Sequence, residues 1–333
     1  IMTAAAAQAS YLNTTLDNYR AQMVDNVFSK HVLSWLLMDK SRTRMLTGGE
    51  QIVEHLLTAD NSDTGNLAEW AQFDITPQGG IAVAKYDWKQ LVTSIAISGM
   101  EELKNNGKEA ILNLLEARVK QSETSLQKKV NDQLLGVSSG GWTSIYDAID
   151  NTAVLGELDP ATATYWVSPI EDRAAGVSGV TAGTATFAQL QASLTNLYNT
   201  SSDGNEHVHC LLGTQDIFEI YELGLTPNVR FQAKTKDGDI GFTNLLFKGV
   251  PFYFDKAAQA GSVIGINTDT LTLVGHKDRW FKQSAFTDSP IDSAHATTGD
   301  ATFVDARYAV ISAVGNLTVN DRRKNFKMKG FNL

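Results

Sequence analysis

The run from Ile81 to Ser98, "IAVAKYDWKQLVTSIAIS", restricts the fold of this chain more than any other segment. It contains neither proline nor glycine and is rich in β-branched and aromatic residues, which is typical of a strand. Extended throughout, it would reach roughly 60 Å at about 3.3 Å per residue. Because this length exceeds the width of a compact domain, we predict that part of the run projects from the body of the protein.

A turn sequence before this run predicts a hairpin. "TPQGG" separates it from "WAQFDIT", and a glycine pair at positions 48 and 49 precedes both. We therefore predict a long hairpin within residues 48–98. Its aromatic side chains are too many to remain in water on a projecting element, so another chain is expected to cover them. Alanine at the two tryptophans would then impair assembly and leave subunit folding nearly intact. These candidate assembly residues are Trp70, Phe73, Tyr86 and Trp88.

Helical periodicity predicts a second long element, a helix from about Lys108 to Leu135. At 1.5 Å per residue it would be about 40 Å long. A further helix is expected from about Ala4 to Lys40, and a short one after the capping box that Thr186 and Gln189 form. The apolar stripe of the long helix consists of Ile111, Leu115, Val119, Leu126, Val130 and Leu134.

The C-terminal part of the chain is predicted to consist of strands. The segments "FKGVPFYFD", "SVIGINTDTLTLVG" and "DARYAVISAVGNLTVND" are rich in β-branched and aromatic residues and are separated by Gly, Asn and Asp turns. Residues 136–183 are instead rich in Gly, Ser, Thr and Ala, which indicates loops. Strands and helices alternate irregularly, so we predict an α+β fold with a mainly antiparallel sheet.

The stretch "NEHVHCLLGTQDIFEIYE" is the strongest candidate for a metal site, since it holds His207, His209 and the only cysteine, Cys210. "HVHCLL" alternates like a strand, however, so Cys210 would point away from both histidines. Zinc sites need three or four protein ligands, and no second His or Cys cluster exists. We therefore expect Cys210 to be a small buried hydrophobe, and Thr214 to cap a following helix. A metal-dependent enzyme that uses the two histidines remains an alternative.

The charge balance argues against a protein that grips nucleic acid. The formal net charge is −9, whereas phosphate binding requires a basic surface. One cysteine fits a reducing compartment, the start lacks the basic region of a secretory signal, and no apolar run approaches the length of a membrane span. A basic segment near the end is either a solvated strand end or a contact with nucleic acid or an acidic partner. Its candidate lumen or partner contacts are Arg322, Arg323, Lys324 and Lys327.

The order of these elements resembles the major capsid protein of tailed bacteriophages, with the Hong Kong 97-type fold. The segments that carry the resemblance are "TGGEQIVEHLL", "TSIAISGMEELKNNGKEAILNLLEARVKQSETSLQKKVNDQLLG", "DPATATYW" and the C-terminal strands. The resemblance covers about Leu33 to Phe331. It implies an N-terminal arm at 1–47, an extended hairpin loop at 48–98, a peripheral domain at 99–142 and 251–333 with a spine helix at 102–135, and an axial domain at 143–250. Part of the C-terminal block would be shared with the axial domain.

This resemblance implies a structural protein of the virion, without catalytic residues, cofactor or metal. Copies would form hexamers and pentamers that close an icosahedral shell around double-stranded DNA, without sequence-specific binding and without a membrane, after assembly in the host cytoplasm. A scaffolding protein and a portal are implied partners, while a decoration protein and a maturation protease are left open. Some members carry an N-terminal scaffolding domain; here that segment is either absent or removed by processing. A bacterial nanocompartment shell of the encapsulin type has the same fold and is the alternative function.

Overall fold

The computed structural model describes residues 32–37, 42–61, 64–66, 69, 79–104, 114–136, 140–173, 186–204, 206–225, 245–288 and 306–331. The chain forms two compact units, and each is considered by itself. Among the described residues, unit 1 comprises 90–104, 114–129, 278–288 and 306–314, and unit 2 comprises the others. Among the described elements, two strands, one α-helix and one 3-10 helix have residues in both units.

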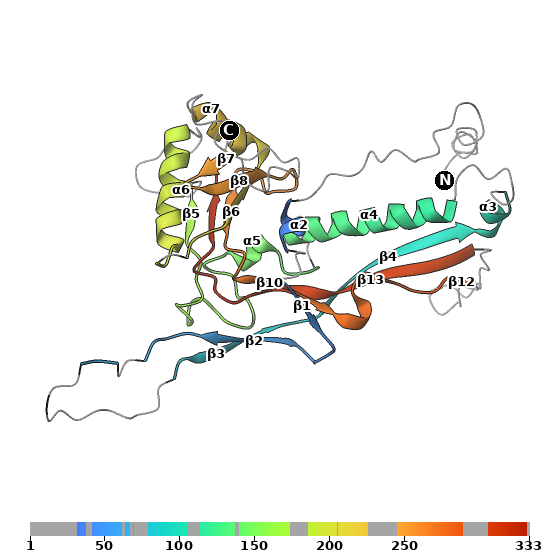
Figure 1. The fold of residues 1–333 in the computed structure, drawn as a ribbon, viewed down its shortest axis with the longest axis horizontal. Helices are drawn as coiled ribbons and strands as arrows, with labels where there is room; N and C mark the ends of the chain where they lie inside the picture. The colour runs from blue at the N-terminus through green and yellow to red at the C-terminus, as the bar shows by residue number, and fades with distance from the viewer. Residues whose placement is uncertain are drawn as a thin grey trace. The chain divides into compact units, whose positions relative to one another are not determined.

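Unit 1 is built on two long strands and a long helix, labelled in Figure 1. Strand β13 pairs with β4, and it also pairs antiparallel with β11 and β12. Burial alternates along both long strands: Leu91, Ile95 and Ile97 are buried on β4, and Ala309 and Ile311 on β13. The elements of this unit are β4 (Lys89–Ser98), α3 (Gly99–Lys104), α4 (Leu114–Leu134), β11 (Lys282–Gln283), β12 (Thr287–Asp288) and β13 (Ala306–Val319), preceded by the 3-10 helix η2 (Lys277–Arg279).

The predicted long helix is confirmed from Leu114 to Leu134, and its first part lies outside the described residues. Leu126, Val130 and Leu134 of the predicted stripe are buried. Of the predicted N-terminal helix, the structure describes only α2 (Val32–Leu37), whose Leu33 and Leu37 are buried. The remainder of that prediction falls outside the described residues.

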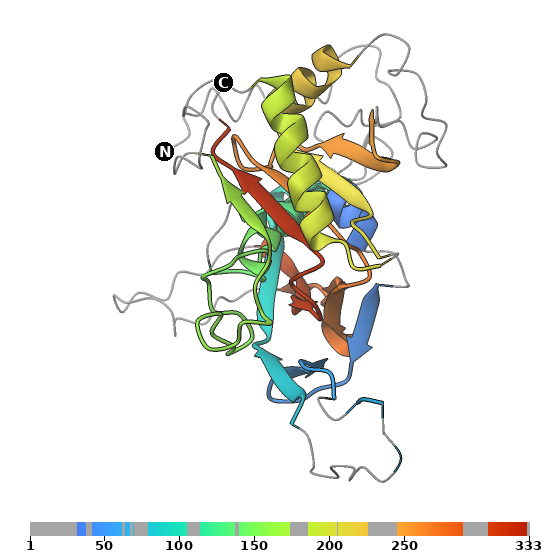
Figure 2. The ribbon, with the colours of Figure 1, turned by 90° about the vertical axis from the view of Figure 1, so that its left-hand side faces the viewer.

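A mixed six-stranded sheet forms the core of unit 2, with strand order β5-β14-β9-β6-β8-β7. Helices α6 and α7 pack against this sheet (Figure 2), where Phe218 of α7 and Phe252 of β8 meet with ring centroids 5.6 Å apart. The elements are β5 (Ile170–Asp172), α6 (Phe187–Ser201), β6 (Cys210–Gly213), α7 (Gln215–Gly224), β7 (Leu245–Phe247), β8 (Val250–Phe254), β9 (Val263–Ile266) and β14 (Phe326–Lys329).

Local signals place the two helices as predicted, with one difference. The capping box of Thr186 and Gln189 is present at the start of α6. Thr214 occupies the N-cap position of α7, but its side chain makes no capping hydrogen bond. The helix predicted after Thr214 is present, and its Ile217, Phe218 and Tyr221 are all buried.

The remaining strands of unit 2 belong to a second sheet and to a separate two-stranded hairpin. Strand β1 (Thr43–Leu46) pairs parallel with β10 (Leu271–His276), which pairs antiparallel with the last residues of β13. Strands β2 (Ile52–Leu57) and β3 (Ile81–Tyr86) form a separate two-stranded antiparallel sheet, in register from Ile52 opposite Tyr86 to Leu57 opposite Ile81. We call this β2–β3 pair the hairpin. The short helix α5 (Ile145–Ala148) lies in the predicted loop region.

The hairpin differs from its prediction in its strands. The partner of Ile81–Tyr86 is Ile52–Leu57, not "WAQFDIT", most of which lies outside the described residues. The predicted continuous strand is interrupted at Asp87 and Trp88, and its second half, β4, pairs with β13 instead of continuing the hairpin. The strand that this run contributes to the hairpin is therefore shorter than the sequence suggested.

Candidate functional site

One face of the hairpin is fixed to its own subunit. Alternate residues of β2 are buried, as are Ala84 and Tyr86 of β3. The Tyr86 hydroxyl donates a hydrogen bond to the backbone oxygen of Val319, 3.3 Å away, and burial raises the pKa of Tyr86 well above its usual value. Glu54 forms an ion pair of 2.9 Å with Arg44 and accepts a hydrogen bond from Thr318. This inner face thus carries apolar packing and satisfied polar groups.

The opposite face of the hairpin is exposed and mostly aliphatic, with His55 opposite Val83 and Lys85 opposite Val53. A direct cross-strand pair also places Leu57 beside Ile81. Leu57 and Ile81 are each 78% exposed, Val53 is 39% exposed and Val83 36%. We call Val53, Leu57, Ile81 and Val83 the outer apolar face. Four exposed aliphatic side chains on one face of a hairpin are typical of a protein interaction site.

Sequence reasoning did not find the outer apolar face, because it considered only the aromatic residues. Trp70 and Phe73 lie outside the described residues. Tyr86 is 3% exposed within its own subunit, so the prediction that a second chain covers it is corrected. Trp88 is half-buried; its Nε1 donates a hydrogen bond to the Gly49 oxygen at 2.9 Å, and its ring meets His276 edge-on. Tyr86 and Trp88 therefore both stabilise the base of the hairpin.

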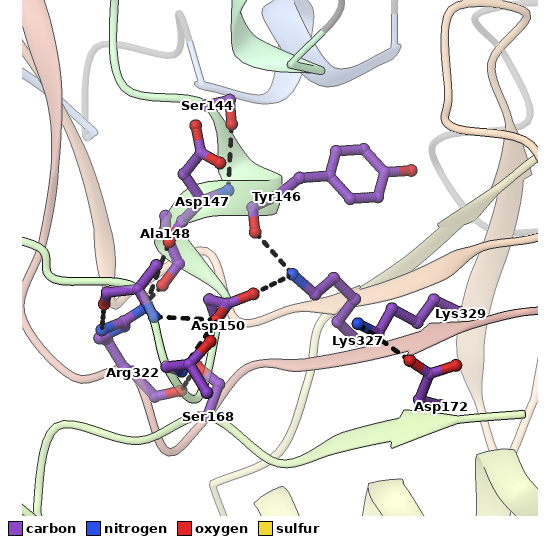
Figure 3. Close-up of polar contacts among 12 residues, drawn as sticks. Ser144, Tyr146, Asp147, Ala148, Asp150, Ser168, Asp172, Arg322, Lys327 and Lys329 are labelled. Carbon is purple, nitrogen blue, oxygen red and sulfur yellow. Dashed lines mark hydrogen bonds and ion pairs between the residues drawn. The ribbon is translucent and has the colours of Figure 1, made fainter. Parts of the chain in front are cut away.

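Arg322 is buried, which corrects its predicted role as a lumen or partner contact. Its guanidinium group donates hydrogen bonds to four backbone oxygens, those of Asp147, Ala148, Ala153 and Trp166, at 2.8–3.2 Å. Figure 3 labels Arg322 together with Asp147 and Ala148. Burial lowers the pKa of Arg322, and the charge of nearby Asp150 opposes this shift. The side chain joins the loop around α5 to the segment before β14.

Lys327 is corrected in the same way. It is 6% exposed, and its Nζ donates to the Tyr146 oxygen at 2.8 Å and to Asp150 Oδ2 at 2.7 Å (Figure 3). Burial alone would raise the pKa of Asp150, but hydrogen bonds from Lys327, Thr152 and Ala153 outweigh it and hold that pKa well below its usual range. The pair is an internal ion pair of the subunit.

The other basic residues of this segment are nearer the surface. Arg323 is exposed and forms an ion pair with Asp321 at 3.3 Å, while Lys324 pairs with Glu206. Lys329 pairs with Asp172 at 3.0 Å. Contact of Arg323 and Lys324 with the lumen or a partner stays a prediction.

The strand in the histidine stretch is shorter than predicted. Strand β6 begins only at Cys210, which is buried as expected. His207 and His209 lie with ring centroids 6.2 Å apart, and His209 Nδ1 is 2.8 Å from the Thr268 hydroxyl. Among the described residues, no group of three or more His, Cys, Asp or Glu side chains is arranged to hold a metal ion. None of the helices described is long and apolar enough to cross a membrane.

Comparison with known proteins identifies the fold. No protein-family profile matches the sequence, and no curated protein matches it. The structure is similar to a chain of the cyanophage A-1(L) capsid asymmetric unit, with a TM-score of 0.62 and 16% identity over 96% of this chain and 98% of the other. It also matches the capsid of the native GTA particle, with a TM-score of 0.59 and 11% identity over 100% of both chains.

A third solved structure comes from a different kind of shell. The holo-SrpI encapsulin complex from Synechococcus elongatus PCC 7942 matches with a TM-score of 0.53 and 8% identity, over 97% of this chain and 95% of the other. The likeness to all three structures extends over nearly the whole chain rather than over one domain. The chain therefore has the α+β Hong Kong 97-type capsid fold.

Proposed function

We propose that this chain is the major capsid protein of a tailed bacteriophage, which self-assembles into hexamers and pentamers that close an icosahedral shell around the phage genome. The observation that carries the proposal is the outer apolar face of the hairpin. The fold supports it, because the chain matches capsid chains over nearly its whole length. In this proposal the chain is a structural protein and not an enzyme.

The outer apolar face would dock on a second copy of the chain. Its four aliphatic side chains are exposed in one subunit, and burying a large aliphatic side chain contributes about 1.5–3 kcal/mol. The inner face is already occupied by the hairpin's own subunit. The hairpin can therefore bind a neighbour with one face while the other keeps it attached.

The proposal keeps the predicted division into arm, hairpin loop, peripheral domain and axial domain. The strand order of the six-stranded sheet supports a C-terminal block shared between domains. Strands β9, β14 and nearly all of β8 come from residues 251–333, and they share the sheet with β5, β6 and β7 from residues 143–250. The axial domain would be this sheet with α6 and α7.

The charge of the chain supports a container rather than a DNA-binding protein. The net charge is −9, and the described cations of the basic segment have partners within the subunit. DNA would pack inside without being held to the wall. A scaffolding protein and a portal are expected partners during assembly in the host cytoplasm, and a decoration protein and a maturation protease remain open.

The nanocompartment alternative has less support. The encapsulin chain matches with 8% identity and a TM-score of 0.53, against 16% and 0.62 for the cyanophage capsid chain. The contents of the shell separate the two functions, because a phage shell encloses DNA and a nanocompartment encloses protein.

Expression of the chain, alone and with the scaffolding gene of its own genome, tests the proposal. We expect ring-shaped capsomers or closed shells in electron micrographs and by sedimentation velocity. A subunit that remains monomeric under all these conditions would refute the proposal. Particles from infected or induced cells should contain nuclease-protected DNA; particles filled with one enzyme and no DNA would support the nanocompartment instead.

A further inference from the structure

A tight turn from Leu155 to Leu158, outside the hairpin, has an unusual backbone. Leu155 and Leu158 exchange backbone hydrogen bonds of 3.2 and 3.1 Å, and both central residues, Gly156 and Glu157, have φ of 63°. Two positive φ values define the type I′ turn, whose second central position favours glycine or asparagine. A glutamate there carries a backbone strain that needs an explanation elsewhere. We call residues 155–158 the strained turn.

The strained turn is in close contact with strand β3 of the hairpin. The Lys85 backbone N–H of β3 donates to the Gly156 oxygen at 3.0 Å. A Cβ atom at Gly156 would lie 2.8 Å from the Cβ of Ala84, closer than side-chain carbons approach. The Glu157 carboxylate is 3.2 Å from Lys85 Nζ and accepts a 3.4 Å hydrogen bond from Gln51. Backbone, packing and charge thus all join the turn to the hairpin.

The strained turn is itself tied to the buried Arg322. Trp166 Nε1 donates to the Leu155 oxygen at 3.0 Å, and Trp166 is buried. Arg322 donates to the backbone oxygens of Trp166 and Ala153, which flank the turn in the chain. The turn therefore connects β3 of the hairpin to the interior of unit 2.

We propose that the strained turn sets the orientation in which the hairpin presents its outer apolar face, with Gly156 and Glu157 as positioning residues. This inference rests on the proposed function, in which that face binds a second copy. An isolated two-stranded hairpin is marginally stable and would not hold one orientation by itself. The positive φ of Glu157 is explained because it places the carboxylate beside Lys85 and Gln51, on the hairpin that it positions.

A steric test of this contact uses two small residues. Gly156→Ala adds a methyl group that overlaps Ala84, and Ala84→Gly removes the group it meets, so the double variant restores the space. The left-handed strain of alanine at position 156 is the same in the single and double variants, and their difference isolates the contact. We expect Gly156→Ala to speed hydrogen exchange of the Lys85 amide about tenfold, as overpacking of a close contact does, and the double variant to reverse most of this.

A charge test uses Glu157→Gln, with Lys329→Gln as the matched control. Lys329 also forms an exposed ion pair with a carboxylate, but on β14, next to the edge strand β5 of the six-stranded sheet. Glu157→Gln should speed exchange of the hairpin amides about threefold, the size of a surface ion pair, and reduce the yield of closed shells. Lys329→Gln should change neither, and the melting temperature of both variants should match that of the wild type.

The outcomes separate this inference from the proposed function. If the wild type assembles and Gly156→Ala assembles equally well with unchanged Lys85 exchange, the positioning role is overturned and the capsid function stands. If the wild type does not assemble, the capsid function fails, while the exchange rates still decide whether the turn holds the hairpin. Failure of Ala84→Gly to rescue Gly156→Ala would also overturn the steric contact.

Discussion

Replacing Leu57 and Ile81 together by threonine tests the outer apolar face directly. The two residues are opposite each other across the hairpin and are each 78% exposed. Threonine keeps the preference for a strand but removes most of the apolar area. Because about 1.5–3 kcal/mol accompanies burial of such a side chain, the pair should lose about 2–4 kcal/mol per subunit contact. This corresponds to a roughly 30- to 1,000-fold weaker association at about 1.4 kcal/mol per tenfold.

The stability of the free subunit should hardly change. Both side chains project from its surface, where substitutions usually shift stability by less than about 0.5 kcal/mol. Sedimentation velocity over a range of protein concentrations, with electron microscopy, measures assembly, and thermal unfolding measures the subunit. The control is Leu223→Gln on α7, which is 76% exposed. A double variant that assembles at the wild-type concentration, or a control that loses assembly to the same degree, would refute a specific role of the hairpin face.

Three further substitutions test the internal contacts. Arg322→Met leaves four backbone oxygens without their donor and should cost about 3–5 kcal/mol in the free energy of unfolding by urea. Asp150→Asn should destabilise the subunit at pH 7 by about 3 kcal/mol, because Lys327 loses its buried partner. The lowered pKa of Asp150 gives stability that is full above the unfolded value of about 4 and is lost as the pH falls further. The melting temperatures of wild type and this variant should therefore converge in acid; a constant difference down to pH 2 would contradict the ion pair. Trp88→Ala should lower the free energy of unfolding by about 1–3 kcal/mol, because the variant loses the hydrogen bond to Gly49 and the packing on His276. An unchanged melting temperature would show that Trp88 does not stabilise the base of the hairpin.

Local patterns predicted the elements whose determinants lie close together in sequence. The capping box at Thr186 marks the start of α6, and the alternating C-terminal segments correspond to β8, β9, β10 and β13. The pairing of β2 was missed because "IVEHLL" does not alternate cleanly between apolar and polar residues. The structure gives the physical reason: one face packs on the subunit while the other is apolar and exposed, so both faces carry aliphatic residues.

Long-range contacts were beyond local reasoning. The sequence showed that Arg322 and Lys327 are charged, but their partners lie about 150 residues or more away, in Asp147–Trp166. A run of basic residues usually indicates a solvated surface. Lys327 and Lys329 lie two residues apart on β14 and therefore project from the same face of the strand. Lys327 is buried beside Asp150, whereas Lys329 is exposed beside Asp172. The tertiary contacts at each position, and not the charge count, decide which cation is buried.

If the chain forms a shell around DNA, as we propose, the partners of these cations affect how strongly the shell wall attracts DNA. Affinity for phosphates grows with the number of cations that are free to release counterions. Arg322 and Lys327 are buried, and Arg323, Lys324 and Lys329 each lie beside a carboxylate of their own subunit. Turning Arg323 toward a phosphate would leave Asp321 unpaired next to a second negative charge, which offsets the gain. The buried cations of this segment therefore hold the chain together, and in the proposed shell its paired cations would add little attraction for an enclosed genome.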